Sequence, residues 1–290
     1  MKKIIILIPV FNDWPSLKKL IHEISLQINS IRTFKFSMII INDGSTTTQP
    51  EIKKPQNLEF IKILNMIENR GHAECIAYGI NYINKNENFD NLLLMDGDGE
   101  DRPEEINKLL EQVKLNHGSS VVAKRVKRSE GLIFRLLYQF HKIITLIFTG
   151  RKINFGNFSC LSKEDILRIC NNATLWSSYS GTFKKYIKNY NEINSIRGLR
   201  FFGPSKMSIF KLMYHSFSII EVFKYQVLLR SFLLAVGLIY LSKYLGNLLI
   251  YFSVLTILFC LTIFTVSILN KRAYIRSKKN NLRNISNITN

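Results

Sequence analysis

The sequence predicts an α/β protein with a mostly parallel sheet, followed by helices at a membrane surface and a C-terminal helical hairpin that crosses the membrane. Three observations support this prediction. Short apolar runs alternate with amphipathic helical patterns between residues 3 and 125. Polar residues follow three of the apolar runs. A stretch of 27 residues without any charge, Tyr244 to Asn270, lies near the C-terminal end.

The expected strands and helices follow one another in α/β order. Strands are expected at 3–10, 36–43, 91–98 and 119–125, and helices at 14–28, 72–83 and 103–113. These strands are apolar on both faces, which is typical of parallel strands covered by helices on both sides. Ligands of such sheets bind beyond the carboxyl ends of the strands.

Polar groups gather at these predicted strand ends. Residues 9–13 follow the first strand, "NDGS" (42–45) follows the second, and "DGDGED" (96–101) follows the third, with four carboxylates among its six residues. Ordinary α/β proteins also have polar loops at this edge, so the polar rim alone is weak support for a site.

Asp96 and Asp98 are candidate ligands of a divalent cation. Gly97 and Gly99 free the backbone, so that both carboxylates can turn toward one ion. Hard oxygen ligands suit Mg²⁺ or Mn²⁺, which take further ligands from water and substrate phosphates. A turn or a helix N-cap is the alternative explanation of the same residues.

Composition favours a folded protein with a basic second half. The 290 residues suit one domain with an appendage, and the hydrophobic content of 47% excludes a disordered chain. Residues 1–119 carry a net charge of −2, whereas residues 120–290 carry +21. Basic surfaces attract nucleic acid, anionic lipid or phosphorylated substrates. The adjacent apolar segment favours a membrane, and no helix-turn-helix or single-strand-binding signature points to nucleic acid.

The C-terminal region predicts a multi-pass membrane protein. The uncharged stretch exceeds the roughly 20 residues needed to cross a bilayer. Upstream, residues 227–242 contain Arg230, and form either a second span with Arg230 snorkelling at the interface or a helix lying among the head groups. Two spans leave both ends on one side. The six Lys/Arg from Lys271 onward, without an acid, place that side in the cytoplasm.

Two further features agree with a cytoplasmic catalytic domain. The first apolar run ends in Asn12, Asp13 and a proline without a small-residue cleavage site, so it is expected to be a strand and not a signal peptide. The four cysteines show no metal-ligand spacing, which fits a reducing compartment.

Five motifs, in their order and spacing, resemble those of the family 2 glycosyltransferases of the GT-A fold. They are "IPVFND" (8–13), "NDGSTT" (42–47), "NRGHAECIAYGI" (69–80), "DGDGEDRPEEI" (96–106) and "FFGPSKMS" (201–208). The chain is most similar to the polyprenyl-phosphate glycosyltransferases, the group of dolichol-phosphate mannose synthase and its bacterial relatives. The resemblance covers nearly the whole chain and implies the Rossmann-like fold of nucleotide-diphospho-sugar transferases.

The resemblance also implies roles for particular residues. The donor would be bound by Pro9, Phe11, Asp13, Asp43, Asn69, Gly71, Asp96, Gly97 and Asp98. Asp96 and Asp98 would hold Mg²⁺ or Mn²⁺ and, with Arg125 and Arg128, serve catalysis. Arg200, Ser205 and Lys206 would bind the acceptor phosphate. A phosphate acceptor is already ionised at neutral pH, so it needs no general base; basic residues would relieve the repulsion between the two anionic substrates.

Three residues depart from the family pattern. Glu100 replaces a Gln, so an anion stands where a neutral contact near the sugar or acceptor is expected, while Asn42 and Asn154 each replace an Asp. The identity of the sugar therefore does not follow from the resemblance.

The expected organisation is a catalytic domain over 1–208 with an interfacial helix at about 131–148, a juxtamembrane helix at 209–226, two membrane helices within 227–270 and a basic cytoplasmic tail at 271–290. The expected function is metal-dependent, inverting sugar transfer from a nucleotide-diphosphate sugar to a polyprenyl phosphate. The alternatives are transfer to a lipid-linked glycan or surface polysaccharide, and a catalytically inactive relative. Self-association through the membrane helices is a further expectation.

Overall fold

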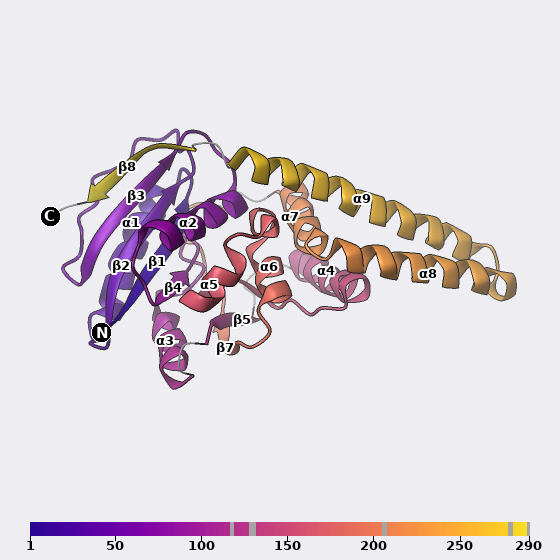
Figure 1. The fold of residues 1–290 in the computed structure, drawn as a ribbon, viewed down its shortest axis with the longest axis horizontal. Helices are drawn as coiled ribbons and strands as arrows, with labels where there is room; N and C mark the ends of the chain where they lie inside the picture. The colour runs from indigo at the N-terminus through magenta and orange to yellow at the C-terminus, as the bar shows by residue number, and fades with distance from the viewer. Residues whose placement is uncertain (117–118, 128–131, 205–207, 278–280, 289–290) are drawn as a thin grey trace.

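A computed structural model describes residues 1–290 except 117–118, 128–131, 205–207, 278–280 and 289–290. Its centre is one eight-stranded sheet with helices on both faces. A long hairpin of two helices extends away from this α/β part (Figure 1). The predicted fold class is thereby confirmed.

The sheet has the strand order β7-β5-β6-β4-β1-β2-β3-β8. The strands are β1 (Lys2–Val10), β2 (Phe34–Asn42), β3 (Leu58–Met66), β4 (Asn91–Leu94), β5 (Val121–Lys127), β6 (Phe155–Ser162), β7 (Asn191–Ile196) and β8 (Leu282–Ile288). Strands β4, β1, β2 and β3 pair in parallel, while β6 and β8 run antiparallel to their neighbours. The carboxyl ends of four adjacent strands therefore meet at one edge.

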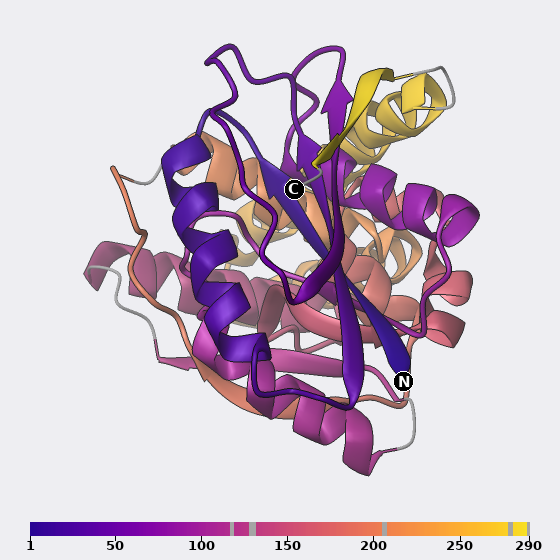
Figure 2. The same cartoon turned by 90° about the vertical axis from the view of Figure 1, so that its left-hand side faces the viewer.

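Two apolar layers sandwich the sheet. On β1 the alternation of side chains sends Ile4, Ile6 and Ile8 to one face and Ile5 and Leu7 to the other. Helices α1 (Trp14–Ile28) and α3 (Ile106–Leu115) cover the first face. Helices α2 (His72–Asn86), α5 (Lys163–Ile169) and α6 (Tyr179–Tyr186) cover the second. Figure 2 shows α1 and α2 on opposite sides of the strands.

Two short 3₁₀ turns complete the α/β part, at Pro103–Glu105 and Ala173–Trp176. The structure contains every strand and helix that the sequence predicted there, with ends shifted by a few residues. It also contains β3, β6 and β7, which the sequence analysis did not identify. Strand β3 carries Glu59, Lys62 and Asn65, so it lacks the continuous apolar run of the central strands.

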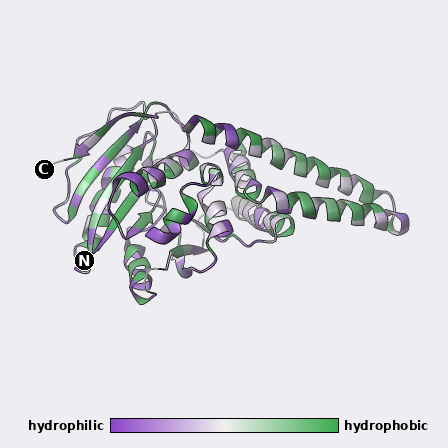
Figure 3. Cartoon of the chain, viewed as in Figure 1, coloured by the Kyte–Doolittle hydropathy of each residue, from purple (hydrophilic) through white to green (hydrophobic). Residues whose placement is uncertain are grey.

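Four helices lie on the hairpin side of the α/β part: α4 (Leu132–Thr149), α7 (Ile209–Glu221), α8 (Lys224–Leu245) and α9 (Leu248–Ser277). Helices α8 and α9 are long and apolar enough to cross a membrane. Figure 3 shows apolar residues along both. Residues from all four helices share one apolar cluster around Ile220, Val227 and Ile263, so α4 and α7 are docked against the base of the hairpin.

Arg230 of α8 contacts the end of α4. Its Nη1 donates a hydrogen bond to the carbonyl of Ile147, at 3.1 Å, in the last turn of α4. A cation is favourable at a helix C-terminus, where carbonyls lack helical partners. Arg230 therefore connects α8 to α4. Neither of the two positions expected from the sequence, snorkelling at the interface or lying among the head groups, included this contact.

The chain returns to the sheet after the hairpin. Strand β8 pairs antiparallel with β3, matching Ile61 to Ile288 and Asn65 to Asn284. Residues 271–290, expected from sequence to be a basic tail, thus include the last turns of α9 and the edge strand of the sheet. Both ends of the hairpin lie at the α/β part, as expected for two spans.

Candidate active site

The acidic loop begins directly after β4. This strand is buried and pairs with β1, so Asp96 emerges beside the end of β1. A Cβ atom on Gly97 would lie 2.8 Å from the carbonyl oxygen of Pro9. Only glycine allows the two backbones to approach this closely. Pro9 and Gly97, both predicted from the resemblance as donor-site residues, are therefore in contact.

Asp96 is held by two side chains that the sequence analysis did not select. Its Oδ1 accepts a hydrogen bond from Asn157 Nδ2 at 3.0 Å and lies 3.1 Å from His72 Nε2. Asn157 comes from β6 and His72 is the first residue of α2. Burial alone would raise the pKa of Asp96, but His72, Arg125 and Asn157 outweigh it and hold the pKa well below its usual range.

Asp98 and Asp13 share one arginine. Arg200 Nη1 lies 2.6 Å from an oxygen of Asp98, and its Nη2 lies 2.5 Å from an oxygen of Asp13. All three side chains are less than a fifth exposed. Burial and the neighbouring Asp96 charge raise the pKa of Asp98 to about 6, against the opposing effect of Arg200. Arg200, predicted to bind the acceptor phosphate, thus contacts Asp13 and Asp98, two of the predicted donor-site residues.

Asp101 is buried beneath the loop and supports it. Its Oδ2 accepts a hydrogen bond from the backbone N–H of Asp96 at 2.9 Å, and Arg125 Nη2 lies 3.8 Å from its Oδ1. Burial and the Asp96 charge raise the pKa of Asp101 to about 8, although Arg125 opposes this. Arg125, a predicted catalytic residue, therefore lies beside the acidic loop.

Glu100, the departure from the family pattern, forms an ion pair with Arg197. Both side chains are less than a fifth exposed. The backbone N–H of Gly198 also donates to the carbonyl of Glu100 at 2.8 Å. The extra negative charge therefore has a protein partner in this structure, Arg197. Its expected position near the sugar or acceptor stays a prediction.

Three of the predicted donor-binding residues, Asp43, Asn69 and Gly71, follow the ends of β2 and β3. Both oxygens of Asp43 accept backbone hydrogen bonds, from Arg70 at 2.7 Å and Gly71 at 2.9 Å. Asp43 is only 4% exposed, and its burial raises its pKa. The carboxylate thus shapes the loop before α2. Asn69 and Phe11 are exposed on the same edge.

The turn after β1 is fixed by Asn12, which has a positive φ of 49°. Its Oδ1 accepts hydrogen bonds from the backbone N–H groups of Thr46 at 2.8 Å and Thr47 at 3.1 Å. Non-glycine residues rarely adopt this backbone conformation without such support. Hydrogen bonds of Asn12 therefore connect the turn after β1 to the turn after β2.

His215 on α7 interacts electrostatically with residues of the site. Burial, together with the smaller effects of His72, His141 and Arg125, lowers the pKa of His215 to about 4, while Asp96 opposes this shift. Burial also opposes the charge on His72, yet Asp96, Asp98 and Asp101 raise its pKa above the ordinary value. An electrostatic interaction thus links His215 of α7 to the site, which local sequence gave no means of predicting.

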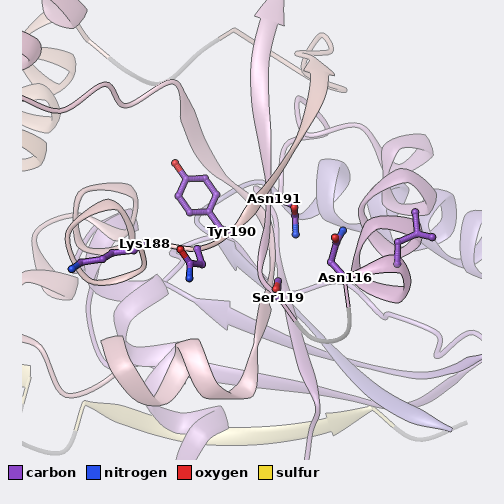
Figure 4. A pocket seen from close by; sticks show the side chains of 7 residues that line it. Asn116, Ser119, Lys188, Tyr190 and Asn191 are labelled. Atoms are coloured by element: carbon purple, nitrogen blue, oxygen red, sulfur yellow. The ribbon is translucent and has the colours of Figure 1, made fainter.

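Three predicted residues, Arg128, Ser205 and Lys206, lie outside the described residues. A separate surface depression of about 540 Å³ opens at the other end of β5 and β7 (Figure 4). It is lined by Leu115, Asn116, Ser119, Lys188, Asn189, Tyr190 and Asn191. None of these residues was predicted to act in the site.

The acidic loop contains the type of ligand that a hard divalent cation prefers. Asp96 and Asp98 carry carboxylate oxygens, which suit Mg²⁺ and Mn²⁺, and in this structure they contact Asn157 and Arg200. Among the residues that the structure describes, no three His, Cys, Asp or Glu side chains converge as a metal cage. Such ions commonly take their remaining ligands from water and phosphate oxygens.

This fold, with an acidic loop at the carboxyl edge of a mostly parallel sheet, defines a transferase of the GT-A class. The family comparison then makes the assignment specific. Residues 5–198 match the model of glycosyl transferase family 2, so the chain belongs to this family.

Curated relatives include undecaprenyl-phosphate 4-deoxy-4-formamido-L-arabinose transferases. The protein of Yersinia enterocolitica is 26% identical over 226 residues, covering 73% of this chain and 65% of the relative. The protein of Serratia proteamaculans is 25% identical over 270 residues, covering 85% of this chain and 78% of the relative. The match to the Yersinia protein thus spans less than two thirds of that relative.

Solved structures support the same fold. Glucosyl-3-phosphoglycerate synthase from Mycobacterium tuberculosis, crystallised with Mn²⁺, UDP-glucose and phosphoglyceric acid, superposes with a TM-score of 0.52 at 13% identity. The match covers 78% of this chain and 80% of that one. Another mycobacterial protein superposes with a TM-score of 0.53 at 12% identity, over 78% and 75% of the two chains. At these identities the likeness concerns the fold alone.

Proposed function

We propose that this protein transfers a sugar from a nucleotide-diphosphate donor to a polyprenyl phosphate in the membrane, with a divalent cation at Asp96 and Asp98. The observation that carries the proposal is the position of the acidic loop. It lies at the carboxyl edge of the sheet and is held by Asn157 of β6. Ile153, just before β6, packs against Ile219 of α7, and α7 packs against α8 and α9. A water-soluble donor and a lipid acceptor can therefore meet there.

The cation, when bound, would act as a Lewis acid that stabilises the leaving diphosphate. The protein's own residues would do the rest. Pro9, Phe11, Asp13, Asp43, Asn69, Gly71 and Gly97 would form the donor side. Arg125 would offset the repulsion between the two anionic substrates, together with Arg128.

Arg200, Ser205 and Lys206 would bind the acceptor phosphate. Arg200 is held by Asp13 and Asp98 in this structure. Its guanidinium would offset the negative charge of the acceptor phosphate beside the acidic loop. The phosphate monoester is ionised at neutral pH, so the nucleophile needs no general base.

The membrane arrangement is part of the proposal. Helices α8 and α9 would span the bilayer, α4 and α7 would lie at its surface, and the α/β part would face the cytoplasm with the basic residues that follow Asn270. Inversion at the anomeric carbon is carried over from the family resemblance.

The test is a transfer assay with the purified full chain in detergent or liposomes, Mn²⁺, a panel of nucleotide sugars and a polyprenyl phosphate. The expected product is a lipid-phosphate sugar that mild acid cleaves. Transfer only to a lipid-linked glycan would favour the alternative acceptor. The proposal fails if no donor gives a lipid-phosphate product while the chain remains folded.

A further inference from the structure

The segment after the second membrane helix reaches the donor side of the rim. Strand β8 lies beside β3 at the edge of the sheet (Figure 1). Before it, Asn281 is buried, with 3% exposure. Its carbonyl accepts a hydrogen bond from the backbone N–H of Ile67 at 3.0 Å, and its Oδ1 accepts one from Arg70 Nη2 at 3.1 Å.

Arg70 belongs to the loop that holds Asp43. The backbone N–H groups of Arg70 and Gly71 donate to the two oxygens of Asp43. The loop is also packed tightly against the end of β2, because a Cβ atom on Gly44 would lie 2.5 Å from the carbonyl carbon of Glu68. A shift of the Arg70 loop would therefore displace Asp43 and the turn at Gly44.

A second connection runs through side-chain amides across three strands. Asn284 Oδ1 on β8 accepts from Asn65 Nδ2 on β3 at 2.8 Å, and Asn65 Oδ1 accepts from Asn42 Nδ2 on β2 at 2.8 Å. Asn42 Oδ1 in turn accepts from the backbone N–H of Ser45 at 3.0 Å. The chain of amides thus ends in the "NDGS" turn. Asn42 stands where the family has an Asp. Because its side chain is an amide, it has an N–H group that can donate to Asn65.

Helix α9 also contacts the donor-side helix. Arg276 Nη2 lies 3.8 Å from Glu74 on the first turn of α2, and Tyr274 packs on Trp176 with ring centroids 6.3 Å apart. These contacts come from the last turns of α9, before residues 278–280. The last turns of α9 therefore contact the start of α2, just after the loop that Asn281 contacts.

We propose that Asn281 and Asn284 are positioning residues for donor binding, through which the C-terminal return segment sets the shape of the donor-side loops at Asp43 and Arg70. This inference rests on the proposed function, because it assumes that these loops receive the nucleotide. The segment contacts no reacting atom. Its effect is on the binding of the nucleoside diphosphate, and the acceptor side is unaffected.

The experiment measures the binding of a panel of nucleoside diphosphates (UDP, GDP, ADP, CDP and dTDP) to the full chain with Mn²⁺, by calorimetry. The loss of a hydrogen bond to a charged group predicts that Asn281→Ala weakens nucleotide binding by about tenfold. Asn281→Asp keeps an acceptor for Arg70 and should restore binding to within about twofold of the original. The KM for the acceptor should stay unchanged in both variants.

Strand β8 offers a matched pair of controls. Asn284 and Asn287 are both exposed, but they point to opposite faces of the strand. Asn284→Ala, which breaks the amide chain, should weaken binding by about threefold. Asn287→Ala should leave it unchanged. Because Asn284 is exposed, this variant still gives an answer if Asn281→Ala fails to fold.

The outcomes separate the two levels of inference. If the original chain binds none of these nucleoside diphosphates with Mn²⁺, the proposed function is overturned and the positioning role falls with it. If it binds one of them, but Asn281→Ala and Asn284→Ala bind it equally well, only the positioning role is overturned. Equal losses for Asn284→Ala and Asn287→Ala would also contradict it, since they would indicate a general weakening of the edge strand.

Discussion

The acidic loop and the helical hairpin depart from ordinary burial in opposite directions. The loop gathers carboxylates whose side chains are largely buried, such as Asp96 and Asp101. The hairpin exposes large apolar side chains along its length, such as Leu258 at 52%. A buried charge is costly because it has lost its contact with water, and exposed apolar surface is costly because it remains in contact with water. The carboxylates of the loop are compensated within the protein, by groups such as Arg200 and Arg125. The proposed function adds a cation with phosphates at the loop and lipid around the hairpin.

The largest effect should come from removing a carboxylate of the loop. Asp98→Ala should lower sugar transfer by about a thousandfold, because it removes a proposed ligand of the cation that stabilises the leaving group. Turnover in the transfer assay measures it. Glu59→Gln is the control, since Glu59 belongs to a surface ion pair with Lys35 and should not affect turnover. Comparable activity in both variants would contradict the metal assignment.

The second largest effect should show whether an exposed leucine faces lipid or water. Leu258 on α9 and Leu26 on α1 are similarly exposed, at 52% and 57%. A lysine at the centre of a membrane span costs about 2.5 to 3.5 kcal/mol of insertion free energy, so Leu258→Lys should reduce the fraction of protein that stays in alkali-washed membranes. Leu26→Lys should behave like the original chain, because α1 would face water. Equal membrane retention of the two variants would argue against α9 as a span.

A smaller effect tests the support of Asp96. Asn157→Ala removes the hydrogen bond to Asp96 Oδ1 and the contact with His72, and should lower turnover by about tenfold. Asn86→Ala is a matched control, because Asn86 bonds only its own helix, at the carbonyl of Tyr82. Full activity of Asn157→Ala would show that Asp96 is positioned without the amide.

The smallest effect concerns the ion pair of Glu100 and Arg197. Removing one partner leaves the other charge poorly compensated, so Arg197→Gln should lower the Tm more in the original chain than in a Glu100→Gln background. The coupling should be on the order of 1 kcal/mol, as for a partly exposed pair. Thermal melts of the two single variants and the double variant measure it. Additive changes in Tm would mean that the pair does not act as a unit.

Much of the fold follows from short-range patterns. The buried central strands and the helices between them were predicted because each is encoded by apolar periodicity within a few residues. Strand β3 was missed because Glu59, Lys62 and Asn65 interrupt its apolar run. Strand β8, "LRNISNI", is largely exposed, so its sequence carries little apolar signal.

The candidate site likewise has features that follow from neighbouring residues and features that depend on distant ones. The sequence by itself determined the acidic loop, the turns after β1 and β2 and the apolar hairpin, because each depends on neighbouring residues. Only the tertiary structure decided the partners: Arg197 for Glu100, Arg200 for Asp98, and Asn284 for Asn65, which are 97, 102 and 219 residues apart in the chain. Such pairs form because the sheet and helices bring segments that are distant in sequence into contact. A local sequence pattern contains no information about which distant segments will meet.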